Sequence, residues 1–161
     1  MSKDLYIDRL KSVPLFASMS KKELDVMVKQ ADHLRYPAKH TVVVDGTAGE
    51  EFWLVIEGEL AVQRGGAEVA KLGPGDSFGE LAVIDPAPRD ATVVSTSPVE
   101  LMVIGRQRFW ATLESNPTLM RKVIVGLAHR LRHMDADDTA SRLNAGGEPI
   151  DVTNRSVPAQ G

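Results

Sequence analysis

The chain has 161 residues, of which 43% are apolar and 25% charged, and this is typical of one globular domain with a full hydrophobic core. A net charge of −3 argues against a basic nucleic-acid-binding surface, and the absence of cysteine excludes disulfides and thiolate zinc sites. Residues 1–9 do not resemble a signal peptide and no apolar run is long enough to span a bilayer, so we expect a soluble, cytoplasmic protein.

Residues 1–38 have the pattern of N-terminal helices. Leu5, Leu10 and Val13 recur at near-helical spacing. Ser20 and Glu23 form the pattern Ser-x-x-Glu, in which the serine caps the first turn and the glutamate reaches back to the cap. A second helix is therefore expected to begin after Ser20.

Between residues 40 and 104 the sequence pattern changes to short runs rich in β-branched residues, separated by glycines. The predicted strands are Thr41–Val44, Phe52–Ile56, Leu60–Gln63, Val69–Leu72, Ala91–Thr96 and Val99–Ile104. Hairpin turns are predicted at Gly58 and at Gly65-Gly66. Short strands at close spacing with glycine-rich turns predict an antiparallel sandwich or barrel.

Residues 106–135 are expected to be helical again. A short helix is predicted over Arg106–Glu114, and Asn116-Pro117 marks a break and restart. The following long helix is predicted to end near Met134. Residues 136–161, with Gly146-Gly147 and two prolines, have the composition of a flexible tail.

Apolar residues repeat along the long helix at intervals of four and three. This seam consists of Met120, Ile124, Leu127, Leu131 and Met134. Two interpretations follow, a parallel homodimer through the helix or packing of a single apolar face on the barrel. We favour the homodimer.

The segment from Gly79 to Arg89 combines groups that suit a nucleotide. Gly79 lets a ligand approach the backbone closely, and the helical turn after it presents free N–H groups. Glu80 offers a carboxylate to a sugar hydroxyl, and the planar guanidinium of Arg89 suits a phosphate. On spacing alone, the alternative is that Glu80 and Arg89 simply pair with each other.

This segment also resembles a known motif. Residues 78–93, FGELAVIDPAPRDATV, are similar without a gap to the phosphate-binding cassette of cyclic-nucleotide-binding domains. That family includes catabolite activator proteins and regulatory subunits of protein kinase A. The resemblance extends from about Leu10 to Arg132, and it includes Glu57-Gly58-Glu59-Leu60 and the lead into the cassette at residues 72–78.

The resemblance implies an α+β fold. An antiparallel β jelly-roll barrel of about eight strands, residues 40–104, would be flanked by N-terminal helices and by two C-terminal helices, the last one long. The whole binding domain would cover residues 1–135.

The resemblance also implies a binding site without a catalytic or metal-ligating residue. Glu80 would hold the ribose 2′-hydroxyl and Arg89 the cyclic phosphate, and the long helix would act as a lid. The implied ligand-binding residues are Phe78, Gly79, Glu80, Leu81, Ala82, Pro88, Arg89, Asp90 and Ala91, with lid contacts from His129, Arg130 or His133. The short helix with Trp110 would be the hinge of the lid.

Two residues depart from the family pattern. Asp90 stands where a small residue is usual, and a carboxylate there opposes an anion. It would point away, pair with Arg89, or accept a hydrogen bond from guanine. Lys39 stands where a turn glycine is common, which changes turn geometry.

These observations predict a cAMP sensor, with cGMP as the other ligand considered, that needs no cofactor and is not an enzyme. Residues after Asp135 contain too few apolar side chains for a helix-turn-helix unit, so we expect output to a separate effector protein, without specific DNA binding or membrane contact. The alternatives are a jelly-roll interaction module that has lost its ligand and, less favoured, a cupin-like metalloenzyme.

Overall fold

The computed structural model describes residues 3–146, with side chains described as far as Met134. The helical elements are α1 (Lys3–Lys11), the 3₁₀ turn η1 (Pro14–Phe16), α2 (Lys21–Lys29), α3 (Glu80–Ile84), α4 (Arg106–Ser115) and α5 (Pro117–Gly146). The strands are β1 (Asp32–Tyr36), β2 (Thr41–Val43), β3 (Ala48–Gly49), β4 (Glu51–Glu57), β5 (Leu60–Arg64), β6 (Ala67–Leu72), β7 (Ser77–Phe78), β8 (Ala87–Pro88), β9 (Thr92–Ser95) and β10 (Val99–Gly105).

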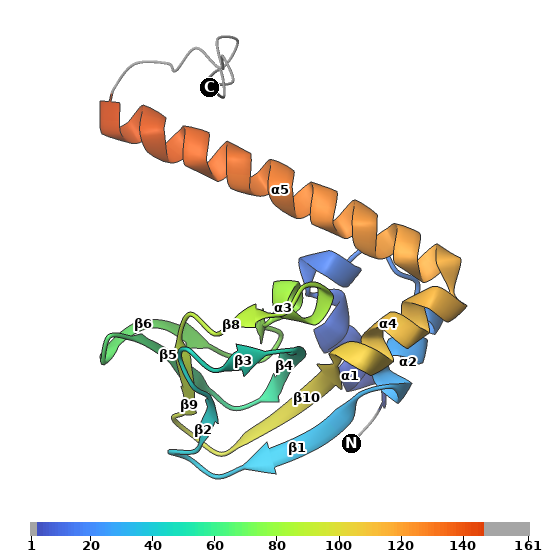
Figure 1. Cartoon of the computed structure of the whole chain (residues 1–161), viewed down its shortest axis with the longest axis horizontal. Coiled ribbons are helices and arrows are strands. Elements are labelled where there is room, and N and C mark those ends of the chain that lie inside the picture. Colours follow the sequence, from blue (N-terminus) through green and yellow to red (C-terminus); the bar gives the residue numbers. More distant parts are fainter. Residues whose placement is uncertain (1–2, 147–161) are drawn as a thin grey trace.

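The strands form two four-stranded antiparallel sheets and one small pair. The sheet orders are β1-β10-β4-β7 and β2-β9-β5-β6, and β3 pairs with β8. Figure 1 shows the barrel on one side of the molecule, with α1, α2 and α4 gathered at its end and α5 running past α3. The predicted α+β jelly-roll is confirmed. The described residues contain ten strands, where about eight were expected, and three of the ten, β3, β7 and β8, have only two residues each.

The predicted hairpin at Gly58 was wrong. β4 pairs with β10 and β7, whereas β5 pairs with β6 and β9, so the chain passes from one sheet to the other at Gly58. Gly58 has φ +92°, and a side chain there would collide with Pro98 and Val99. The corner therefore needs glycine. The hairpin at Gly65-Gly66 is confirmed, since Arg64 and Ala67 face each other across β5 and β6.

Strand β1 lies in the region that was predicted to be helical. It pairs along its length with β10, from Asp32 opposite Val103 to Tyr36 opposite Val99. It forms the edge of its sheet and is mostly exposed, and only Leu34 and Tyr36 pack against the barrel core, which is too short an alternation to have predicted a strand.

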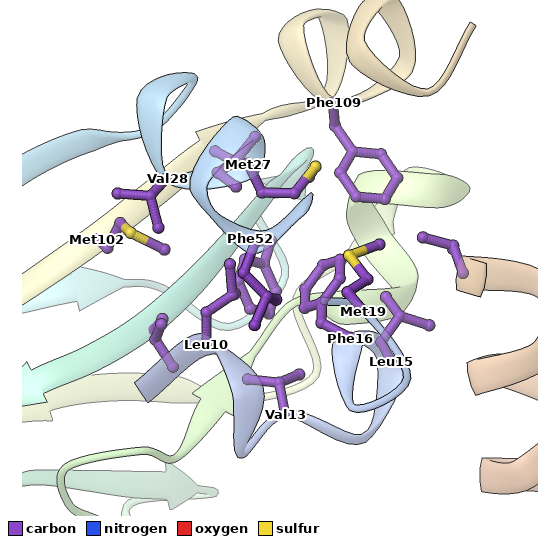
Figure 2. Close-up of a cluster of buried hydrophobic side chains, with 14 of the residues drawn as sticks. Leu10, Val13, Leu15, Phe16, Met19, Met27, Val28, Phe52, Met102 and Phe109 are labelled. Atoms are coloured by element: carbon purple, nitrogen blue, oxygen red, sulfur yellow. The ribbon is translucent and has the colours of Figure 1, made fainter. Parts of the chain in front are cut away.

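The N-terminal helices and both C-terminal helices share one apolar core. Figure 2 shows Phe16 of η1 between Phe52 of β4 and Phe109 of α4, with ring centroids 5.5 Å and 6.4 Å away. The capping box of Ser20 and Glu23 that begins α2 is confirmed. This core joins segments distant in sequence, and it places α3, α4 and η1 around the start of α5.

Helix α5 is longer than predicted. It begins at Pro117 as expected but continues beyond Met134 to Gly146, because the added residues are mostly compatible with a helix. Residues 147–161 of the predicted tail lie outside the described part. The first half of α5 buries Leu119 and Val123 in the N-terminal core rather than on the barrel. Within residues 3–146, no helix combines the length and apolar character that a bilayer crossing requires.

Candidate functional site

A cavity of about 330 Å³ opens beside the segment from Phe78 to Ala91, a size suited to a small ligand. All nine ligand-binding residues predicted from the sequence line this cavity. The remaining lining residues are Val43, Val62, Arg64, Leu72, Ala87, Val93 and Arg130. The site therefore combines the predicted segment with strands of the second sheet and with α5.

Gly79 and α3 shape one wall of the cavity. Gly79 precedes α3 with φ +82°, a left-handed conformation that glycine adopts without strain. Buried Val83 anchors the short helix to the N-terminal core. The N–H groups of Glu80, Leu81 and Ala82 lie in the first turn, where no intrahelical acceptor exists. These backbone donors are thus available to an acceptor at the cavity wall.

Arg89 lies beside Gly79, where a Cβ would come within 2.7 Å of a terminal guanidinium nitrogen, and it is buried, with 8% of its surface exposed. The short β3-β8 pair fixes its backbone, since the Arg89 N–H donates to the Thr47 carbonyl over 2.8 Å and its carbonyl accepts from Gly46 over 2.7 Å. Its side chain passes Gly49, where a Cβ would lie 2.6 Å from the arginine Nε. The backbone thus leaves room for this guanidinium.

The Arg89 guanidinium is only partly satisfied within the protein. One terminal nitrogen donates to the Glu51 carbonyl over 3.0 Å and lies 3.4 Å from the Glu51 carboxylate. Nε is buried and has no hydrogen-bond partner. A guanidinium has five N–H donors, and within the described residues Glu51 alone accepts from this one, so the remaining donors favour an anionic or oxygen-rich ligand.

Glu80 and Arg89 do not pair with each other, contrary to the alternative left open by the sequence. Ser77 donates a hydrogen bond from its hydroxyl to the Glu80 carboxylate. The other Glu80 oxygen lies 3.8 Å from a terminal nitrogen of Arg130 on α5. The carboxylate is therefore shared between the cavity wall and the long helix.

Asp90 pairs with Arg64 rather than with Arg89. The Asp90 carboxylate lies 3.1 Å from a terminal nitrogen of Arg64, and Arg64 Nε donates to the Asp90 carbonyl over 3.2 Å. Asp90 is exposed at the rim of the cavity. The sequence did not single out Arg64, although its alternation with Leu60 and Val62 along β5 places it on the cavity-facing side.

The rest of the lining is apolar. Val43, Val62, Leu72 and Val93 come from the second sheet, and Phe78 stacks on Trp53 with ring centroids 5.9 Å apart and an interplanar angle of 7°. These side chains offer a flat, apolar surface next to the charged wall. Such a surface suits the apolar faces of a sugar or an aromatic ring.

Of the three predicted lid residues, Arg130 lines the cavity. His129 and His133 are exposed on α5 and do not belong to the lining. Trp110 of the predicted hinge helix α4 donates from its indole nitrogen to the Ile84 carbonyl over 3.3 Å, which ties α4 to the end of α3. Among the residues that the structure describes, no three histidine or carboxylate side chains gather as a metal site would require.

The sequence profile described as "Cyclic nucleotide-binding domain" matches residues 33–116, which include the cavity segment and most of the barrel. The chain belongs to the cyclic nucleotide-binding domain family. The match extends through α4 and stops just before α5 begins.

Two relatives illustrate this membership of the cyclic nucleotide-binding domain family. The chain is 30% identical over 133 residues to the cyclic AMP receptor protein of Thermus thermophilus, covering 80% of this chain and 62% of the relative. It is 33% identical to a cAMP-dependent protein kinase regulatory subunit of Aspergillus niger, covering 73% of this chain and 29% of that subunit. The chain thus spans less than two thirds of these relatives.

Two solved structures are also similar to this chain. The N-terminal domain of a transcriptional regulator from Streptomyces coelicolor superposes with a TM-score of 0.76 at 27% identity, covering 80% of this chain and 96% of that one. The regulatory domain of Toxoplasma gondii protein kinase A, solved with cAMP, gives 0.63 at 35% identity and covers 68% of this chain and 44% of that one.

Proposed function

We propose that this domain binds a cyclic nucleotide, cAMP in first place, in the cavity between α3, Arg89 and the second sheet. The observation that carries the proposal is the buried Arg89 guanidinium, which only Glu51 among the described residues partly pairs, in the same cavity as the half-buried Glu80. A cyclic phosphate needs a cation and backbone donors, and a ribose 2′-hydroxyl needs an acceptor. The cavity offers all three together.

In this proposal Arg89 and the first-turn N–H groups of α3 hold the phosphate, because planar guanidinium donors match phosphate oxygens. Glu80 accepts the ribose 2′-hydroxyl. The base lies against the apolar lining. We favour cAMP over cGMP because Asp90 lacks the hydroxyl usual in guanine-selective relatives, and the carboxylate of Asp90 is occupied by Arg64.

We propose further that the domain is a regulatory module that signals through α5 to a separate effector protein. Arg130 links α5 to Glu80, so a ligand that binds Glu80 would alter the ion pair that holds the helix at the cavity. A ligand shifts a helix only by its differential affinity for the two positions. The effector recognises the resulting position of α5. Catalysis, specific DNA binding and membrane contact are not part of this cytoplasmic function.

A second copy of the chain is the proposed partner of the exposed α5 face. Ile124 and Leu131 are 59% and 64% exposed, and Val125 and Met134 are also exposed. Ile124, Leu131 and Met134 belong to the predicted four-three seam, whose other members, Met120 and Leu127, pack against the core of the same chain, so the proposed dimer would use the exposed three. Light scattering should give a dimer for the wild type and a monomer for Ile124→Glu/Leu131→Glu. A monomeric wild type at about 100 µM would contradict this assembly.

The experiment that tests the binding function is calorimetric titration of the full chain with cAMP and with cGMP. We expect saturable binding of cAMP, loss of detectable binding in Arg89→Ala, and strong weakening in Arg89→Lys, which keeps the charge but loses the planar geometry. At one hundred times the dissociation constant, ligand should stabilise the fold by about 2.7 kcal/mol.

Arg35→Ala is the control, because Arg35 is exposed and lies 3.9 Å from the buried Glu100 carboxylate, away from the cavity. Equal cAMP affinity in the wild type and in Arg89→Ala would place the phosphate elsewhere. A wild type that binds neither cyclic nucleotide at millimolar concentration would leave the alternative, an interaction module of the same fold that has lost its ligand.

A further inference from the structure

Arg64 bridges β5 and the segment after Arg89 through two separate contacts. One of its nitrogens bonds the Asp90 side chain and another bonds the Asp90 main chain, at 3.1 Å and 3.2 Å. Both residues line the cavity. Arg64 therefore holds Asp90 by charge and by backbone at the same time.

The position of Asp90 means that this ion pair affects how well the cavity can bind an anion. Asp90 follows Arg89 directly in the chain, so its carboxylate lies at the rim of the site proposed for an anion. An uncompensated carboxylate about 4 Å from a phosphate in water lowers the association constant about fivefold, and by more where water is excluded. A carboxylate that is paired with a guanidinium contributes much less repulsion.

We infer that Arg64 is a positioning residue of the binding site, which neutralises and orients Asp90 so that an anionic ligand is tolerated next to it. This inference rests on the proposed binding of a cyclic nucleotide at Arg89. Arg64 acts through Asp90 and does not hold the ligand itself. Removing Arg64 is harmful only while Asp90 is present.

The pair matters for binding more than for folding. Arg64 is 57% and Asp90 85% exposed at the side chain, and exposed ion pairs contribute little to the stability of a fold. The ligand, in contrast, brings a new negative charge to the rim. The effect of the pair should therefore appear in ligand affinity while the melting temperature stays nearly constant.

The test is a double-mutant cycle in the full chain, with cAMP titrated into the wild type, Arg64→Ala, Asp90→Ala and Arg64→Ala/Asp90→Ala. We expect Arg64→Ala to weaken cAMP about fivefold at ~20 mM salt and less at ~150 mM, where screening is stronger. Asp90→Ala and the double variant should both bind within about twofold of the wild type. Arg64→Lys should recover most of the loss because the charge is retained.

Arg108 and Asp32 supply the matched control. Their side chains pair at 3.4 Å with similar exposure, and Arg108 also approaches a backbone carbonyl, but the pair lies on α4 and β1 away from the cavity. Arg108→Ala should leave cAMP affinity unchanged. Melting curves of all variants, without ligand, establish that each is folded.

The outcomes distinguish a failure of the positioning role of Arg64 from a failure of the proposed cyclic-nucleotide binding. If the wild type binds cAMP and Arg64→Ala weakens it equally with and without Asp90, Arg64 contacts the ligand directly and the inference is wrong. If Arg64→Ala binds like the wild type at low salt, the pair has no role in binding. If the wild type does not bind cAMP or cGMP, the proposed function fails and this inference fails with it.

Discussion

Arg130 of α5 lies 3.8 Å from the Glu80 carboxylate, so the long helix touches the cavity at the residue proposed to hold the ribose. Ser77 bonds the other oxygen of the same carboxylate. A hydroxyl of a ligand that reaches Glu80 would enter this shared arrangement. In the proposed function, this side chain couples the position of α5 to the occupancy of the cavity.

We predict that Arg130→Ala separates ligand binding from the response of α5. cAMP affinity should stay within about threefold of the wild type, because the pair is longer than a hydrogen bond and partly exposed. In the wild type, cAMP should slow amide exchange in residues 119–134, and in Arg130→Ala this slowing should be lost. Hydrogen–deuterium exchange with mass spectrometry measures this ligand-dependent slowing in both proteins.

Arg132→Ala is the control for this prediction, because Arg132 is exposed on the same helix and does not line the cavity. It should retain the ligand-dependent slowing. If exchange slows only in residues 78–92 of the wild type, α5 does not respond, and an effector must recognise the cassette surface itself.

Gly126 lets α5 lie directly on η1. A Cβ at this position would be 2.5 Å from the Leu15 carbonyl oxygen, which is backbone and cannot easily move. In an open helix, Gly→Ala would add about 1 kcal/mol of stability. Gly126→Ala should instead destabilise the fold by about 1–2 kcal/mol, because it pushes α5 off η1.

Urea unfolding of Gly126→Ala measures this cost. Gly73→Ala is the control, since a Cβ on Gly73 would have no other atom within 4 Å, and this variant should be neutral or slightly stabilising. Increased stability in Gly126→Ala would mean that α5 is not held against Leu15 in solution.

Lys39 adopts a left-handed conformation with φ 67°, which costs a residue with a Cβ roughly 1–2 kcal/mol. Its N–H donates to the Ser95 carbonyl over 2.7 Å, so the turn is fixed by the sheet. Lys39→Gly should raise stability by about 0.5–1 kcal/mol after the entropy cost of glycine. Lys39→Ala keeps the Cβ and should bring no gain; an equal gain in both variants would locate the effect in the lysine side chain.

Glu23 ties α2 to α5. Its carboxylate accepts hydrogen bonds from Lys122 and from the Ser20 N–H, and these contacts, Lys122 first, hold its pKa below the usual 4.5. The unfolded chain therefore binds the proton more readily, so the stabilisation is complete above about pH 4.5 and is lost as pH falls through the lower folded pKa.

Glu23→Gln removes this acid-sensitive contribution. Chemical unfolding between about pH 6 and pH 3 should show a shallower fall in the free energy of unfolding for Glu23→Gln than for the wild type. Lys122→Met should also reduce the slope, because the main cause of the lowered pKa is gone. Parallel profiles in all three proteins would contradict the assignment.

Local chemistry made much of the site predictable from the sequence. Gly79, Glu80 and Arg89 lie within one continuous segment, and their proposed roles were inferred from residue type and from the motif that this segment resembles. The cap of α2 at Ser20 is equally local. What the sequence did not reveal depends on tertiary packing. Strand alternation does not say which sheet a strand joins, so the corner at Gly58 resembled a hairpin.

The partners of the cavity residues could not be predicted either, because they too depend on tertiary packing. Arg64 meets Asp90 only because β5 lies beside β9. On α5, periodicity alone could not distinguish Arg130 from His129 or His133, because the rotation of the helix is set by Leu15 and Gly126. The edge strand β1 offered only the short alternation of Leu34 and Tyr36 among polar residues, which was not enough to predict it.

Three contacts of α5 recur at four-residue intervals, where Lys122 meets Glu23, Gly126 meets Leu15 and Arg130 meets Glu80. One inserted residue between Pro117 and Lys122 would rotate all three by about 100° and break them together. Four inserted residues would nearly restore the rotation but displace each by about one turn, roughly 5–6 Å. An insertion or deletion between Pro117 and Lys122 would therefore break all three contacts at once, whereas a change of Glu23, Lys122 or Arg130 breaks only one.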